Sequence, residues 1–176
     1  MGLEGLTGQK VRQAEVDQKV RRAEVADAAA LVGLRAQMLA DMGQDVGGED
    51  DPWRASALEW FADRLGDRQE FAAFVIDDPA AGVVASAAGV CVHHAPGPGN
   101  VSGVRGHVFN MSSAPTHRRL GYARACLEAL LAWFADETEA RVINLFASQD
   151  GIALYRSLGF DAPQHPGLEL RLTRPS

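Results

Sequence analysis

Apolar residues recur at helical spacing in three long stretches of the chain, 26–42, 53–65 and 122–136. This spacing places apolar side chains on one face, as in an amphipathic helix packed on a core. In the third stretch the shared face is formed by Ala123, Leu127, Leu130, Leu131 and Phe134. The chain is therefore expected to contain at least three helices that bury one side.

Capping residues mark the ends of two of the expected helices. Asp27 is a suitable N-cap and Gly43 a suitable C-cap for the first long helix. A shorter helix is expected over 150–158, because Gly159 follows it as a C-cap.

Strands are predicted where runs of apolar or small residues lie between turn signals. They cover 19–23, 70–76, 83–92, 106–113, 141–146 and 168–172. A turn over 77–82 joins the second and third strands into a hairpin. In chain order, an antiparallel meander precedes one β-α-β unit. We therefore expect an α/β fold of the mixed-sheet (α+β) kind, with a largely antiparallel sheet flanked by helices.

The length of 176 residues suits one domain, which we expect over 19–176 after a polar N-terminal arm at 1–18. No apolar run approaches the ~20 residues that span a bilayer, so no membrane segment is expected. The arm also lacks the apolar stretch of a secretory signal, and a cytoplasmic location is the expectation.

The formal net charge of −6 argues against nucleic-acid binding, which favours a basic surface. It suits either a cationic small-molecule substrate or solubility alone. Cys91 and Cys126 are expected to be buried free thiols. The five histidines form no zinc-type spacing, so no metal is expected.

Residues 115–124 join the strand at 106–113 to the long helix. Within them Arg118, Gly121 and Ala123 follow the spacing R-x-x-G-x-A. Small residues let a ligand approach the backbone, and the N–H groups that open a helix attract anions. The segment is therefore either a pyrophosphate site or a tight turn with solvated arginines.

A second motif runs from Gly151 to Phe160, with Tyr155 on the expected short helix and a Gly-Phe step after it. With the R-x-x-G-x-A turn upstream, the order of elements from about Lys19 resembles the GNAT-type N-acetyltransferases. The resemblance implies a GNAT fold, acetyl-CoA as cosubstrate, and a strand at 106–113 that splays away from the strand at 141–146.

The resemblance also assigns cofactor-binding residues. Free backbone groups of Met111, Ser112 and Ser113 would hold the pantetheine arm. The pyrophosphate would meet backbone N–H groups of Arg119, Leu120, Gly121, Tyr122, Ala123 and Arg124. The side chains of Arg118 and Arg119 would add charge-assisted contacts. Arg124 is either solvated or a contact to the ribose phosphate.

The implied reaction is direct transfer of an acetyl group to a primary amine, which must first lose a proton. Tyr155 is the candidate acid for the departing thiolate. Residues 106–114 contain no Asp or Glu, so His107 is the candidate base, directly or through water. Strand alternation would place His107, Phe109 and Met111 on one face, and Val108, Asn110 and Ser112 on the other.

The resemblance also implies that the acceptor meets the first two helices and their loop at 43–52. Trp53 and Trp60 share a helix face there, either lining the acceptor site or packing in the core. Acidic residues of this loop either attract a polycation or are simply solvated. A small-molecule amine is the leading expectation. The alternatives are a protein or peptide acceptor and a non-catalytic acyl-CoA sensor, and a homodimer is possible in each case.

Overall fold

A computed structural model describes Val16 and residues 19–172. The expected arm at 1–18 lies almost entirely outside these residues. By its internal contacts the chain divides into two compact units, Met1–Phe146 and Ala147–Ser176, which are described separately. The single domain expected over 19–176 stays a prediction. None of the helices in the described part combines the length and apolar character needed to cross a bilayer.

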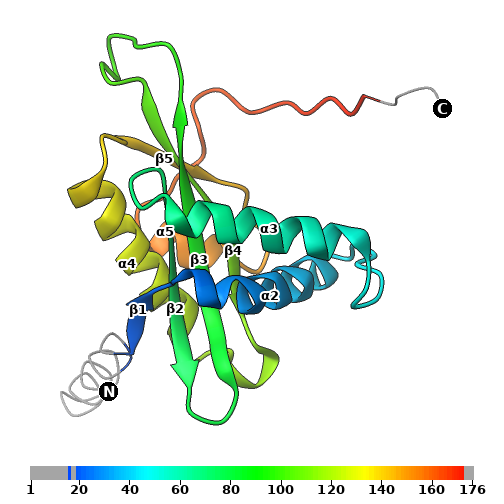
Figure 1. The fold of residues 1–176 in the computed structure, drawn as a ribbon. Coiled ribbons are helices and arrows are strands. Elements are labelled where there is room, and N and C mark those ends of the chain that lie inside the picture. Colours follow the sequence, from blue (N-terminus) through cyan, green and yellow to red (C-terminus); the bar gives the residue numbers. More distant parts are fainter. Residues whose placement is uncertain (1–15, 17–18, 173–176) are drawn as a thin grey trace. The chain divides into compact units, whose positions relative to one another are not determined.

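The first unit is built on a five-stranded sheet with its strands in chain order (Figure 1). The strands are β1 (Val20–Arg22), β2 (Phe71–Asp78), β3 (Gly82–His93), β4 (Val104–Ser113) and β5 (Val142–Leu145). Neighbours pair antiparallel from β1 to β4, and β4 pairs with β5 in parallel. The predicted mixed, largely antiparallel sheet is therefore confirmed, with strand bounds that differ by a few residues at most.

Helices cover both faces of this sheet. They are α2 (Ala28–Asp41), α3 (Pro52–Gly66) and α4 (Tyr122–Glu137), with single 3-10 turns η1 (Val25–Asp27) and η2 (Pro115–His117). The three predicted long helices are confirmed. Asp27 occupies the N-cap position of α2, but its carboxylate does not cap that helix. It accepts two hydrogen bonds from the Arg21 guanidinium and one from the Glu24 N–H, which fixes η1 against β1.

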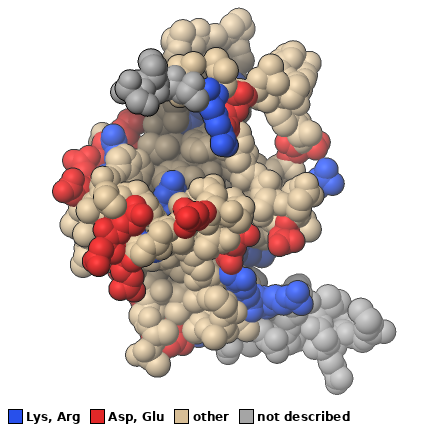
Figure 2. Space-filling model, turned by 90° about the vertical axis from the view of Figure 1, so that its right-hand side faces the viewer, with Lys and Arg blue, Asp and Glu red and all other residues tan. Residues whose placement is uncertain are grey.

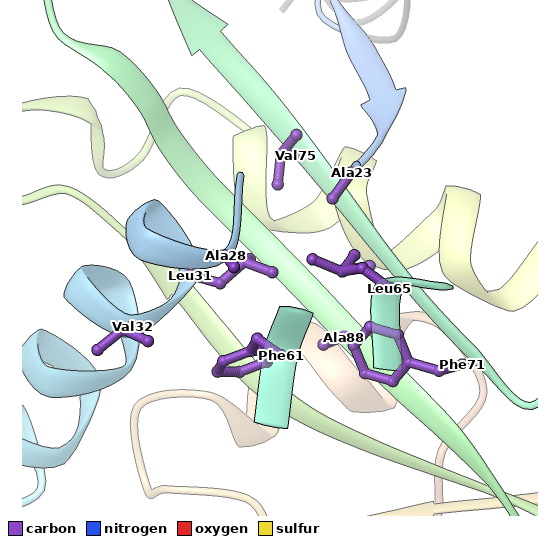
Figure 3. Packing of buried hydrophobic residues seen from close by; sticks show 10 residues of the cluster. Ala23, Ala28, Leu31, Val32, Phe61, Leu65, Phe71, Val75 and Ala88 are labelled. Atoms are coloured by element: carbon purple, nitrogen blue, oxygen red, sulfur yellow. The ribbon is translucent and has the colours of Figure 1, made fainter. Parts of the chain in front are cut away.

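The main core lies between the sheet and the helices α2 and α3 (Figure 3). Its buried members are Ala23, Ala28, Leu31, Val32, Phe61, Leu65, Phe71, Ala73, Val75 and Ala88. On the other face α4 packs against small residues of β3 and β4. A Cβ at Gly89 or Gly106 would lie 2.7 Å from the Phe134 ring. These glycines therefore let α4 approach the sheet closely.

The second unit contains one helix, α5 (Ile152–Ser157), within its described residues. Gly159 follows it with φ of +91°, as expected of a C-terminal cap. The strand predicted over 168–172 is wrong, because this segment has no regular structure. Its alternating leucines Leu168, Leu170 and Leu172 are 98%, 82% and 83% exposed. An alternating pattern forms a strand only when a neighbouring strand accepts its hydrogen bonds.

Candidate active site

The strand β4 is paired on one edge for only part of its length. On the β5 side, pairing runs from Arg105 opposite Val142 to Val108 opposite Leu145, where β5 ends. On the β3 side, pairing continues to Ser113. Within the described residues, no strand pairs with the β5-side edge of 109–113. The expected splay is therefore present, and it lies beside Met111, Ser112 and Ser113.

A β-bulge interrupts β4 at the start of this free edge. Phe109 lies opposite Ala88 and Ser112 opposite Ser86, so two residues of β4 face Ala87 alone. Asn110 takes a left-handed conformation there, with φ of +52°. Asparagine is one of the few residues that adopt this conformation readily.

The bulge changes which way Asn110 points. Its Nδ2 donates to the Leu31 carbonyl of α2 at 3.3 Å, and the Asn110 carbonyl accepts a hydrogen bond from the Ser86 hydroxyl at 3.0 Å. Val108 lies opposite Gly89, the residue beneath Phe134 of α4. The expectation that Asn110 shares a face with Val108 is therefore wrong. Simple alternation assumes an uninterrupted ladder, and the extra residue of a bulge breaks it.

The turn after β4 presents a helix N-terminus. Arg119 and Gly121 have φ of +61° and +85°, and α4 begins immediately after Gly121. The first intrahelical bond runs from the Ala125 N–H to the Gly121 carbonyl. The N–H groups of Tyr122 and Ala123 have no acceptor within the helix, and no acidic residue lies in its first turn. This backbone fits a pyrophosphate, because free N–H groups and the helix dipole both favour an anion.

The arginines of this turn have different surroundings. The Arg118 guanidinium pairs with Asp41 at the end of α2, at 2.6 Å, and its Nε donates to the Ser113 carbonyl at 3.3 Å. It therefore ties the turn to α2 and β4. Arg119 is exposed, as is Leu120. Arg124 pairs with Glu128 one helical turn later, at 3.0 Å. The expected contacts of these residues with a cofactor stay predictions.

His107 lies on β4 directly opposite Asn144 of β5. Its Nδ1 is 2.6 Å from the Asn144 Oδ1. The ring lies nearly parallel to that of Phe109, at 11° and 6.1 Å between centroids, and edge-on to that of Phe146 at 5.7 Å. Asn144 is not among the site residues predicted from the sequence. An asparagine within an apolar strand is a usable signal, but its partner depends on the register between β4 and β5.

Aromatic side chains continue from His107 towards α3. The Trp60 ring makes edge contacts with Phe61, Phe71 and Phe109, at 5.2–5.8 Å between centroids. It is 39% exposed, so it borders the core and also faces outwards. Trp53 is partly buried against the core, and its indole N–H donates to the Val46 carbonyl. Of the two tryptophans, Trp60 is therefore the one in ring contact with β4.

Two carboxylates of the acidic loop at 43–51 accept hydrogen bonds from nearby backbone N–H groups. Asp45 accepts from the Gly47 N–H, and Asp51 caps α3 by accepting from the Trp53 N–H. Acidic and basic side chains are interspersed over one face of the molecule, without a continuous basic surface there (Figure 2).

Tyr155 belongs to the second unit, on α5. Its ring is partly buried and makes an edge contact with Phe160 at 6.0 Å. Burial raises the pKa of its phenol above the ordinary value of 10. The group therefore keeps its proton at neutral pH, as a proton donor must, and its catalytic role stays a prediction.

The family model of the Acetyltransferase (GNAT) family matches residues 37–160. A search of curated proteins gave no match.

Several solved structures share the fold. A predicted acetyltransferase from Clostridium acetobutylicum, solved with acetyl-CoA, is 25% identical with a TM-score of 0.75, covering 86% of this chain and 94% of its own. A GCN5-related N-acetyltransferase from Ralstonia eutropha is 22% identical with a TM-score of 0.71, covering 86% and 97%. Glucosamine-6-phosphate N-acetyltransferase from Arabidopsis thaliana is 13% identical with a TM-score of 0.67, covering 86% and 97%.

The family model spans more than half of the chain and includes both motifs identified in the sequence. The resemblance, the acyltransferase class and acetyl-CoA as cosubstrate are thereby confirmed. The chain belongs to the GNAT family of acetyltransferases.

Proposed function

We propose that this protein transfers the acetyl group of acetyl-CoA to the primary amine of a small molecule. One observation carries the proposal. The free edge of β4 at 109–113 leads within a few residues to the left-handed Gly121 and the N-terminus of α4. An extended edge followed by an anion site suits a pantetheine arm that ends in a pyrophosphate.

Acetyl-CoA supplies a thioester whose acyl carbon is open to attack by a neutral amine. The backbone groups of Met111, Ser112 and Ser113 would orient the arm along the free edge. The N–H groups of Gly121, Tyr122 and Ala123 would bind the pyrophosphate. Arg118 already contacts the Ser113 carbonyl, and it would hold edge and turn in register.

Two proton transfers complete the reaction. His107 lies two residues before the free edge of β4, and its imidazole would take the proton of the attacking amine. Tyr155 would donate its phenolic proton to the departing sulfur. One C–N bond forms and one C–S bond breaks, so one proton leaves the nitrogen and one reaches the sulfur.

The acceptor is proposed to be a small cationic amine. The chain carries 23 acidic against 17 basic residues, and an acidic surface raises the local concentration of cations. The aromatic rings of Trp60, Phe109 and Phe146 form a chain of ring contacts with His107. Such rings suit the apolar part of a compact acceptor. The fold is shared with N-acetyltransferases of a sugar phosphate and of a ribosomal protein, so it does not itself select the acceptor.

The cofactor site is tested by thermal shift with acetyl-CoA, CoA and NADH. We expect both CoA species to stabilise the wild type by about 2.7 kcal/mol at a hundredfold excess over Kd, with no response to NADH. Gly121→Glu should abolish the response, because it places a carboxylate in the anion site. Gly82→Glu is the matched control, since Gly82 is also left-handed, at φ +73°, and has open space around it. Equal responses from the two variants would contradict the site.

The acceptor class is tested by CoA thiol release in the presence of small amines or peptides. We expect release that depends on a small primary amine. Release with peptides alone would replace the small-molecule acceptor by a protein one. Binding of acetyl-CoA without release by any amine would instead favour a sensor.

A further inference from the structure

The pairing of β4 with β5 brings one polar side chain against the candidate base. His107 and Asn144 are direct partners in the parallel ladder, so their side chains leave the sheet on the same side. Their contact joins the ring Nδ1 to the amide Oδ1 at 2.6 Å. Within the described part of the chain, this is the one side-chain hydrogen bond recorded for His107.

The chemistry of the two atoms fixes the position of the ring proton. An amide oxygen accepts hydrogen bonds and cannot donate them, so the Nδ1 of His107 carries the hydrogen. In a neutral imidazole the other nitrogen, Nε2, then holds the free lone pair. The contact therefore leaves Nε2 as the only proton acceptor of the ring.

The neighbouring groups restrict the ring without adding a negative charge. Phe109 lies along one side of it and Phe146 meets it edge-on. Its partner on β3 is Val90, and the charged residue on the same face of β4 is Arg105, two positions earlier. The helix α2 contacts β4 further along, where Leu31 meets Asn110. None of these groups is a carboxylate.

We propose that Asn144 is a positioning residue, which holds His107 in the Nδ1–H tautomer with Nε2 free to take the amine proton. The inference rests on the proposed function for its catalytic consequence. When Nε2 takes a proton, the Nδ1–H bond to Asn144 becomes a bond from a cation and strengthens. Asn144 thus supports proton uptake at the Nε2 of His107, although β4 itself contains no Asp or Glu.

The tautomer is tested directly, without any turnover. Nitrogen NMR of the histidine rings distinguishes a protonated Nδ1 from a protonated Nε2, and His107→Gln identifies the signals. We expect neutral His107 to be protonated at Nδ1 in the wild type, and to become a mixture of tautomers in Asn144→Ala. Val142→Ala is the control, because Val142 is also an exposed residue of β5 and should leave the tautomer unchanged.

The catalytic consequence is tested by the pH dependence of kcat/KM. In Asn144→Asp a carboxylate replaces the amide and stabilises the imidazolium, so a higher pH is needed to free the base. The acid limb should therefore move up by about one pH unit. Asn144→Ala should lower kcat about tenfold, and His107→Gln by a factor of about 10²–10⁴. The double variant should be no slower than His107→Gln, because both changes remove the same function.

The outcomes separate this inference from the proposed function. A wild-type ring protonated at Nε2, or an acid limb unmoved in Asn144→Asp, would overturn the role of Asn144 and leave acetyl transfer in place. A ring protonated at Nδ1 in a protein that releases no CoA with any amine would overturn the proposed function and the catalytic part of the inference. In that case a mixture of tautomers in Asn144→Ala would still show that Asn144 selects the tautomer.

Discussion

At the scale of single residues, the two groups proposed to move protons are prepared in different ways. The hydrogen bond with Asn144 restricts which nitrogen of His107 can accept a proton. For Tyr155 the preparation is burial, which disfavours the charged phenolate and so raises the pKa. A higher pKa keeps the phenol protonated further into the alkaline range, where more of the amine is neutral.

Tyr155→Phe should lower kcat about a hundredfold and leave the affinity for acetyl-CoA unchanged, since the ring remains while the donor is lost. The pKa shift is tested separately. The chain has two tyrosines, so Tyr122→Phe leaves Tyr155 as the single phenol. Its ultraviolet titration should show a midpoint above 10 in the folded protein and return to 10 in denaturant. An unchanged kcat in Tyr155→Phe would reduce the tyrosine to a packing role.

At the scale of elements, β4 contains a bulge that its sequence pattern did not predict. The pattern predicted the strand and its extent, since apolar runs and turn residues report these locally. It did not predict the bulge, because two residues opposite one is a property of the pair β3 and β4. A local signal was nevertheless present. Asparagine tolerates a positive φ, so Asn110 in a strand interior was a candidate bulge position.

The bulge is tested by comparing Asn110→Gly with Asn110→Ala. Both variants lose the hydrogen bond to the Leu31 carbonyl, but glycine adopts the left-handed conformation freely. In this conformation the alanine Cβ costs about 1–2 kcal/mol through steric contact with the backbone. The difference between the variants is smaller than this, because glycine loses more conformational entropy than alanine on folding. Urea unfolding should therefore show Asn110→Ala to be less stable by about 1 kcal/mol. Equal stabilities would indicate that residue 110 is not held in the left-handed region.

At the scale of the whole molecule, the sequence predicted the features that are built from consecutive residues. It did not predict contacts between residues that lie far apart in the chain. The meander, the β-α-β unit and the tight turn before α4 follow from consecutive residues, and the structure contains all three. The pairing of His107 with Asn144 joins residues 37 positions apart, and a shift of β5 by one residue would remove it. The prediction of a strand over 168–172 is wrong for a related reason, because the alternating leucines have no paired strand in the described residues.

The contrast between the paired sheet and the unpaired segment 168–172 predicts a pattern of hydrogen exchange along the chain. Amides of β3, and those amides of β2 and β4 that bond to β3, lie in a continuous ladder and should exchange slowly, through opening of most of the first unit. Amides of α5 should show modest protection, because its bonds include the one from the Tyr155 N–H to the Gly151 carbonyl. The amides of 168–172 have no backbone hydrogen-bond acceptor among the residues that the structure describes, and they should exchange at nearly the rate of an unfolded peptide. Slow exchange at alternate residues of 168–172 would contradict this, because alternation is the protection pattern of a strand bonded along one edge. The segment would then form the strand that its leucines predict, with a partner strand that remains to be identified.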